Sequence, residues 1–455
     1  MGRKLVNSEF GKNVLTLMTG STIAQIIPIA LIPVLARLFS PEEFGAYAFY
    51  TSIITFLLVM SSGRYENAIA LPKEDKHAVN ILVLCFTIMI CFVALLFLIL
   101  FCFDGFIHDA INNQSIANWI WFIPISVFFA STYKIFTYWS NRKKRFKGTS
   151  ISMLSETSAR VGIQLTGGLE KYSVLSEKMN LIEFFKSIFN KSYKSPSGIT
   201  ELGVGTLIFS YALGFFVGTI FLLFPFLKKE KVLLKEVSWS EMKVQAKKYD
   251  NFPKITSFHA LSDELKNIGL TSTILIAFNE TILGFYSMTL RVLRAPLMVI
   301  GNSFSQVFYQ KAAEMYAHEQ NFIPLIYSTL KKMFLIAAPI FIILLLFGPT
   351  LFEFVLGEKW RIAGVYAQYL TPWLFLSFAI SPILQVSAIL NRQGEYFLFS
   401  LLHNVIILGS VLIGGFVFKD LTTGFLILSL LQIIFYFFIF RWVMRISKAA
   451  CEEFE

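Results

Sequence analysis

Six cationic side chains within apolar stretches of this 455-residue chain could have a chemical function. An ionised group in such surroundings is costly, so it usually faces a charged partner or a water-filled cavity. The six are Arg37, Lys134, Arg160, Lys266, Arg291 and Arg294. Arg291 and Arg294 are three residues apart and would project from the same face of a helix. Two interpretations fit: a neutralising network with nearby carboxylates, or a cavity that binds an anion.

The nearby carboxylates do not match the cations in number. Asp263, Glu264 and Lys266 lie together in one apolar stretch, and the next stretch contains Arg291 and Arg294. One positive charge therefore remains unpaired even if both carboxylates are ionised. The other deep cations add to this excess, which favours the anion site.

Some of these charges have a second interpretation. Arg37 and Lys134 lie away from the middle of their stretches, so their side chains could reach the membrane interface. Asp263 or Glu264 could bind Na⁺ or H⁺ during coupled transport. Pairing of both carboxylates with neighbouring cations is the favoured alternative.

The composition is that of a polytopic membrane protein. Hydrophobic residues make up 55% of the chain and charged residues 15%, well below the roughly 25% of soluble domains. Twelve apolar segments can be placed, and their continuous character favours helices over a barrel. They are residues 14–38, 44–62, 79–102, 116–139, 149–169, 202–227, 256–278, 281–304, 331–350, 363–390, 397–418 and 421–442. The fifth is the weakest because it contains Glu156 and Arg160.

The distribution of basic residues predicts the orientation. The net charge is +11, and with the N-terminus inside most Lys and Arg fall in inner loops. The strongest anchor is the basic cluster at 141–147. The positive-inside rule then places both termini in the cytoplasm, and the basic balance indicates contact with anionic lipid rather than nucleic acid.

A short motif occurs twice at an offset of 239 residues. Phe39, Gly45 and Tyr47 follow the first segment, and Phe278, Gly284 and Tyr286 follow the seventh. Six segments separate the copies, so they point the same way, as in a parallel repeat about an axis along the membrane normal. The predicted domains are a bundle at 1–227, a basic linker at 228–254 and a bundle at 255–455. An outer insert at 170–198 shows an apolar helical stripe and is predicted to lie on the membrane or pack on loops.

The residues that nucleotide-binding proteins, enzymes and metalloproteins require are not evident in this sequence. The chain has no Gly-x-x-x-x-Gly-Lys-Ser/Thr loop for a nucleotide. It has no nucleophile with an adjacent base, and its five His residues are scattered, so neither a catalytic site, a metal site nor a cofactor is predicted. Aromatic side chains could stack on sugar rings, although interfacial belts use them more often. The candidates are Tyr133, Tyr138, Trp139, Tyr286 and Trp373.

Five stretches resemble the bacterial polysaccharide and O-antigen flippases. They are Leu35-Ala-Arg-Leu-Phe-Ser-Pro-Glu-Glu-Phe-Gly-Ala-Tyr47, Gly63-Arg-Tyr-Glu-Asn-Ala-Ile-Ala-Leu-Pro-Lys-Glu-Asp75, Tyr138-Trp-Ser-Asn-Arg-Lys-Lys-Arg-Phe146, residues 290–314, and residues 347–373. They follow one another in order over almost the whole chain. The resemblance places the chain in the multidrug/oligosaccharidyl-lipid/polysaccharide (MOP) exporter superfamily.

This resemblance implies a fold and an activity. The implied fold is an all-α, MATE-like membrane protein with about 12 helices in two six-helix bundles, related by a pseudo-two-fold axis along the membrane normal. The implied activity moves an undecaprenyl-diphosphate-linked oligosaccharide, such as an O-antigen, lipopolysaccharide or capsule unit, to the outer leaflet of the bacterial inner membrane. A polysaccharide polymerase and a chain-length regulator are possible partners, and Na⁺ or H⁺ a possible coupling ion.

Combining charge and resemblance yields candidate diphosphate-binding residues. They are Arg291, Arg294, Lys266, Arg160, Lys134, Arg37 and Arg64. Of these, Arg37, Arg64 and Arg291 match motif positions of the family, as does Glu66. Two departures are the long insert and the charged seventh segment. Two rival functions stay open at this stage: a cation-coupled multidrug exporter, and a membrane polymerase or glycosyltransferase.

Overall fold

The chain forms long helices throughout the part that the structure describes. The structure is a computed structural model, and it describes residues 9–111, 114–175 and 197–452. Twelve helices there have at least 20 residues, and no strand occurs among the described residues. The twelve are α2 (Glu9–Leu38), α3 (Pro41–Met60), α4 (Asp75–Ile111), α6 (Ile123–Arg142), α7 (Phe146–Leu175), α9 (Ser197–Lys229), α11 (Ser257–Ala277), α12 (Glu280–Ala317), α13 (Ile323–Leu356), α14 (Arg361–Ile380), α16 (Gln393–Leu412) and α17 (Leu421–Glu452).

These helices match the twelve predicted segments in order, which confirms the all-helical membrane fold. Seven of them are long and apolar enough to cross a membrane by length and composition alone. An eighth span results if the tenth helix is joined to α15 (Val386–Ile389) across a 50° bend. Among the remaining long helices α7 is the least apolar, in agreement with the weak fifth predicted segment.

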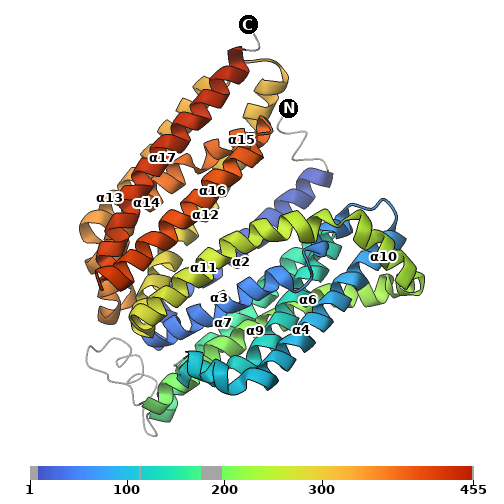
Figure 1. Cartoon of the computed structure of the whole chain (residues 1–455), viewed down its shortest axis with the longest axis horizontal. Helices are drawn as coiled ribbons and strands as arrows, with labels where there is room; N and C mark the ends of the chain where they lie inside the picture. The colour runs from blue at the N-terminus through green and yellow to red at the C-terminus, as the bar shows by residue number, and fades with distance from the viewer. Residues whose placement is uncertain (1–8, 112–113, 176–196, 453–455) are drawn as a thin grey trace. The chain divides into compact units, whose positions relative to one another are not determined.

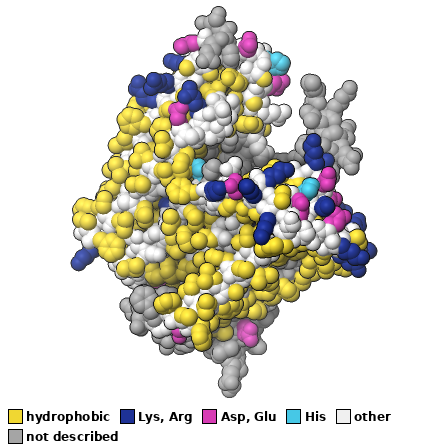
Figure 2. Space-filling model, turned by 45° about the vertical axis from the view of Figure 1, so that its right-hand side comes forward, with side chains coloured by type: hydrophobic (Ala, Val, Ile, Leu, Met, Phe, Trp, Pro, Cys, Tyr) yellow, Lys and Arg dark blue, Asp and Glu magenta, His cyan; other side chains and the backbone are white. Residues whose placement is uncertain are grey.

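The surface of the helices is suited to lipid rather than water. Hydrophobic side chains cover most of the surface drawn in Figure 2, and charged side chains gather in clusters. Phe101 on α4 and Phe354 on α13 are 77% and 81% exposed. A soluble monomer rarely presents such extensive apolar surface, so it faces the hydrocarbon core of a bilayer.

The chain divides into two compact units, Met1–Ile268 and Gly269–Glu455. Figure 1 shows long helices lying beside one another in each. In unit 1 the fourth and sixth long helices, α6 and α9, are in contact, and so are the fifth and sixth, α7 and α9. In unit 2 the equivalent pairs, α14 with α17 and α16 with α17, are in contact too. These two pairings of helices are therefore common to both units.

The repeated motif forms the same local structure in each unit. Ser40 caps α3, since its hydroxyl oxygen accepts a hydrogen bond from the Glu43 amide, and the Glu43 carboxylate accepts one from the Ser40 amide. Asn279, 239 residues later, caps α12 by accepting a bond from the amide of Ile282 at 2.9 Å. Both motif tyrosines are then buried against the sixth helix of their own bundle: Tyr47 contacts Tyr211, and Tyr286 stacks on Phe425. Capping residues at the start of a helix explain why the motif recurs.

Close helix packing in unit 1 depends on glycine. A β-carbon on Gly218 of α9 would lie 2.7 Å from Cε2 of Tyr133 and 2.9 Å from Cβ of Glu156. Ser152 of α7 uses this proximity and donates a hydrogen bond to the Gly218 carbonyl at 2.6 Å. Small residues that allow backbones to approach are typical of membrane helix pairs.

The basic segment predicted as a linker packs against the first bundle. It contains η3 (Lys231–Glu236), α10 (Trp239–Lys248) and η4 (Phe252–Thr256), and it belongs to unit 1. Asn80 of α4 donates to the Glu236 carbonyl and accepts from the Ser238 amide, at 3.1 and 3.0 Å. Tyr65 donates to the Ala246 carbonyl at 3.0 Å. The helical stripe predicted within 170–198 covers residues 181–189 and lies outside the described residues.

Candidate substrate site

A line of polar side chains occupies one face of α7. Ser152, Glu156, Arg160 and Gln164 are four residues apart and therefore share that face. Arg160 Nη1 lies 3.4 Å from Glu156 Oε1, and the Gln164 amide donates to the Ser210 hydroxyl of α9 at 3.0 Å. Polar groups that are satisfied inside the bundle can lie at membrane depth. This internal pairing explains how the least apolar predicted segment is still a helix of the bundle.

Two further cations of unit 1 have carboxylate partners. Lys134 Nζ of α6 lies 2.8 Å from Oε1 of Glu66, which is fully buried in η1 (Tyr65–Ala70). Lys171 Nζ of α7 lies 2.5 Å from Oε1 of Glu43, and both side chains are buried. Together with the Arg160 pair, three interior cations of unit 1 each have a carboxylate partner. These residues therefore contribute little excess positive charge.

Arg37 and Arg64 have different surroundings. Arg37 Nη1 donates to the Pro33 carbonyl one turn earlier on α2, at 3.0 Å. Arg64 lies in a tight turn in which Gly63 and Arg64 have φ angles of 58° and 61°. Its Nε is buried and has no hydrogen-bond partner among the described residues. The role of both arginines in substrate binding stays a prediction.

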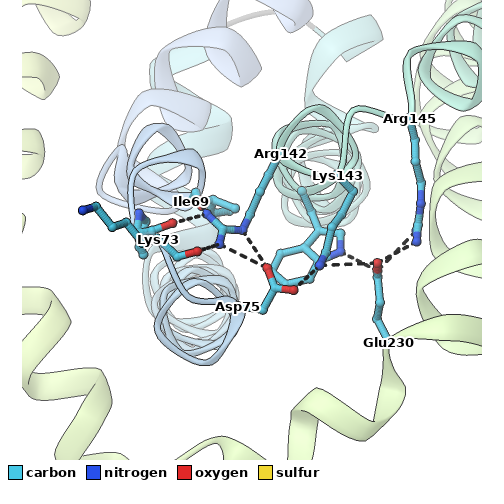
Figure 3. Close-up of polar contacts among 9 residues, drawn as sticks. Ile69, Lys73, Asp75, Arg142, Lys143, Arg145 and Glu230 are labelled. Atoms are coloured by element: carbon cyan, nitrogen blue, oxygen red, sulfur yellow. Dashed lines mark hydrogen bonds and ion pairs between the residues drawn. The ribbon is translucent and has the colours of Figure 1, made fainter.

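Two of the resembling stretches meet at one end of unit 1 (Figure 3). Arg142 of α6 donates to the carbonyls of Ile69, Pro72 and Lys73, at 3.2, 2.6 and 3.4 Å. It also donates from Nε and Nη2 to Asp75 Oδ1, at 3.2 and 3.1 Å. One guanidinium thus fixes the loop between the second and third long helices to the end of the fourth.

A second carboxylate completes this network. Glu230, which follows α9 and is largely buried, accepts two bonds from Arg145, at 3.2 and 2.6 Å. It also accepts one from the Trp139 indole at 2.7 Å. Lys143 lies between the two carboxylates and pairs with Asp75 and, at 3.8 Å, with Glu230 (Figure 3). Three cations of the basic cluster at 141–147 therefore connect helices within unit 1.

Unit 2 contains a polar cavity of about 640 Å³. Its lining comes from α12, α14, α16 and the bend at η6 (Ser381–Gln385). Hydroxyl and amide groups dominate its polar part: Asn302, Ser305, Ser377, Ser381, Gln385, Ser387, Gln393 and Tyr396. Arg294 and His403 are the ionisable groups other than tyrosine in this lining. Such a surface can accept both sugar hydroxyls and an anion.

Arg294 is the cation of this cavity. Its guanidinium carbon lies 5.7 Å from the ring centroid of Trp373, within the range of a cation–π contact. No carboxylate forms an ion pair with Arg294 in the described ranges of the chain. His403 also lies beside this ring, with centroids 6.2 Å apart, and its Nδ1 is 3.0 Å from Oε1 of buried Gln432. Arg294 can therefore pair with an external anion.

The charges of the seventh segment and Arg291 are placed in different units. Asp263 is exposed, and Glu264 accepts a hydrogen bond from the Asn267 amide at 3.1 Å. Lys266 is half-buried in unit 1, whereas Arg291 is exposed on α12 of unit 2. The network predicted across these two segments stays a prediction, and so does an ion site at Asp263 or Glu264.

The residues that complete the cavity were not evident from the sequence. His403, Gln385 and Tyr396 come from segments with no charge pattern, and the bend after α14 brings them to Arg294 and Trp373. Trp373 itself was among the aromatic candidates. Glu43 was visible in the Ser-Pro-Glu-Glu stretch, but its partner Lys171 is 128 residues away.

Comparison with known proteins identifies the family. The family described as polysaccharide biosynthesis protein matches residues 34–175 and 233–363, more than half of the chain. The chain belongs to this family. The matched residues include both copies of the repeated motif, Arg142 with its partners at residues 69–75, and Arg294. No curated protein matches the chain in sequence.

Solved structures agree on the fold of this family member. An inward-facing multidrug resistance MATE family transporter of the MOP superfamily has a TM-score of 0.67 at 12% identity, covering 95% of this chain and 99% of that one. The lipid II flippase MurJ, in an inward closed conformation, has a TM-score of 0.65 at 12% identity, covering 97% and 91%. The predicted polysaccharide family and the MATE-like fold are confirmed.

Proposed function

We propose that this polysaccharide biosynthesis protein moves an undecaprenyl-diphosphate-linked oligosaccharide from the inner to the outer leaflet of the cytoplasmic membrane. The observation that carries the proposal is the polar cavity of unit 2, whose arginine has no carboxylate partner among the described residues. The family and the fold support transport of a saccharide precursor rather than its synthesis.

The physical problem is the passage of a charged headgroup through hydrocarbon. A diphosphate and its sugars would have to cross about 30 Å of apolar medium, and burying unpaired polar groups there is prohibitive. A hydrated cavity with one free cation lowers that barrier. The prenyl chain can remain in the lipid throughout, because only the headgroup needs the cavity.

Each part of the cavity has a role in this account. The Arg294 guanidinium pairs with a phosphate oxygen, for which its planar, paired donors are well suited. The Trp373 ring holds the guanidinium and offers an aromatic face near the sugars. Ser377, Ser381 and Gln385 provide hydroxyl and amide groups for sugar hydroxyls.

Alternating access of the two units would expose the headgroup first inward and then outward. Asp263 or Glu264 would carry the coupling Na⁺ or H⁺ in this scheme. Moving one charge across 100 mV supplies about 2.3 kcal/mol, which is enough to bias such a cycle. A polymerase and a chain-length regulator would act on the translocated unit, and both chain termini would face the cytoplasm.

Deletion and complementation test the proposal. Cells without the chain should accumulate the lipid-linked oligosaccharide on the cytosolic leaflet and lose the surface polysaccharide. The wild-type chain and Arg361→Ala, which alters an exposed cation outside the cavity lining, should both restore it. Full surface polysaccharide in the deletion strain, or restored export of cationic drugs in its place, would contradict the proposal.

A further inference from the structure

A second cavity in unit 2 is a long apolar groove that ends in basic side chains. It has a volume of about 1170 Å³ and lies between α16 and α17, with Tyr327 of α13 at one side. Its apolar lining includes Leu402 and Ile406 of α16 and Leu431, Ile434 and Phe438 of α17. Leu402, Ile434 and Phe438 are 49%, 53% and 58% exposed. The groove is therefore open along its length.

The basic end of the groove comes from one face of α17. Arg441, Arg445 and Lys448 line it, and their spacing of four and three residues places them on one side of the helix. All three are exposed, and none forms an ion pair with a carboxylate in the part of the chain that the structure describes. Glu452 is the acidic residue in the same lining.

A neighbouring carboxylate is already occupied. Glu395 of α16 accepts a hydrogen bond from the Trp442 indole at 2.9 Å and one from Arg392 at 2.6 Å. The bond from Trp442 joins α16 to α17 at the level where the charged residues begin. The cations of the groove are therefore left available to an external anion.

The length of the groove matches one membrane leaflet. Residues 421–440 of α17 contain no charged side chain, and Arg441 is the first cation after them. The ten residues from Leu431 to Arg441 rise about 15 Å along the helix. This distance is about half of the roughly 30 Å hydrocarbon core. The apolar part of the groove thus fits the acyl chain of a phospholipid, whereas a long undecaprenyl chain would extend well beyond it.

We infer that this groove binds an anionic membrane phospholipid, with an acyl chain along Leu402, Leu431 and Ile434 and its phosphate at Arg441, Arg445 and Lys448. The lipid would lie against α16 and α17, the helices that also carry His403 and Gln432. This site is separate from the polar cavity and does not depend on the proposed transport function.

Lipid binding to the purified full-length chain tests this inference. The chain is stripped of lipid in detergent, and phosphatidylglycerol or phosphatidylcholine is titrated while bound lipid is counted by native mass spectrometry. Phosphatidylglycerol should bind the wild-type chain more tightly than phosphatidylcholine. The triple variant R441Q/R445Q/K448Q should bind phosphatidylglycerol about a hundredfold more weakly, because each basic side chain contributes to anionic lipid binding.

Two variants make the result specific. K228Q/K229Q/K231Q removes three exposed cations from unit 1 and should leave the binding unchanged. L402W/I434W fills the groove without changing its charge and should also displace the lipid. Equal loss in both triple variants, or no loss when the groove is filled, would overturn the inference.

Competition identifies the chemistry of the occupant. Inorganic phosphate should compete only weakly, since it lacks the acyl chain. Undecaprenyl phosphate should not displace phosphatidylglycerol at equal concentration. If it displaces the phospholipid, the groove belongs to the prenyl carrier and the inference is wrong, whatever the outcome of the transport assay.

Discussion

The interior cations of unit 1 differ from the cavity cation of unit 2 in the groups that surround them. Lys134, Arg160 and Lys171 each lie within 4 Å of a carboxylate oxygen. Arg294 instead lies over an indole ring in a cavity lined by neutral polar groups. Charges of the same sign can thus hold a bundle together or remain available for a ligand. Which role a cation has depends on whether a carboxylate lies beside it. The number of cations in the sequence does not show this.

Breaking a pair in unit 1 should have the largest effect. In Glu43→Ala, buried Lys171 loses its carboxylate, and α3 loses half of its capping box. We expect a loss of about 3–5 kcal/mol in the free energy of unfolding, because an uncompensated buried charge remains. The thermal unfolding of the purified chain in detergent measures it. The double variant E43Q/K171M should recover most of the loss; a stable E43A chain would show that the pair is unimportant.

Removing the cavity cation should reduce transport but leave the stability of the fold almost unchanged. Arg294→Ala should lower transport tenfold to about a hundredfold, since a hydrogen bond to a charged group contributes about 1.5–3 kcal/mol. The thermal unfolding should change little, because Arg294 is exposed and has no ion pair among the described residues. Arg294→Lys should retain part of the transport. A large loss of stability in R294A would place Arg294 with the structural cations of unit 1.

Two glycine variants test how closely the helices of unit 2 pack against one another. A β-carbon on Gly364 of α14 would lie 2.4 Å from the Gly348 carbonyl oxygen of α13. We expect Gly364→Ala to cost about 1–3 kcal/mol, as forced overpacking does. Gly409→Ala on α16 is the control, because nothing lies within 4 Å of its added β-carbon. Equal melting temperatures for the two variants would show that α13 and α14 are not tightly packed.

The smallest effect concerns the start of α17. Asp420 accepts hydrogen bonds from the hydroxyls and amides of Thr422 and Thr423. These bonds lower the pKa of Asp420 from 3.8 to about 2. A lowered pKa stabilises the fold above pH 3.8, and this contribution is lost as the pH falls towards 2. Since the Asp420 side chain is only partly buried, we expect a contribution of only about 1 kcal/mol.

Unfolding of wild type and Asp420→Asn between pH 5 and pH 2 measures this contribution. The difference between the two chains should shrink as the pH falls, because the wild-type carboxylate becomes neutral. A difference that stays constant over this range would show that the Asp420 charge does not stabilise α17.

The order of the helices could be predicted because each long apolar run identifies one helix by itself. The repeated motif could be predicted for a similar reason, since a cap, a glycine and a tyrosine lie within nine residues. The break in the tenth segment could not, because Ser381 and Pro382 follow an apolar run without any charge. Features formed by residues close together in the sequence, such as single helices and their caps, could therefore be predicted.

The ion pairs and the cavity could not be predicted from the sequence and became evident only in the three-dimensional structure. Glu66 precedes Lys134 by 68 residues, and no feature of either stretch connects them. His403 and Gln432 lie on different helices and show no pattern of charge. The excess of cations predicted an anion site, but only packing distinguishes Arg294 from the paired cations of unit 1.

Binding of undecaprenyl diphosphate to the purified chain tests the central claim most directly. The dissociation constant is measured in lipid nanodiscs for wild type, R294Q and the neutral exchange E156Q/R160Q, which removes a paired cation of unit 1. We predict at least about tenfold weaker binding for R294Q, and binding close to wild type for E156Q/R160Q. Unchanged binding in R294Q, with loss in E156Q/R160Q, would contradict the assignment of the diphosphate to the cavity of unit 2.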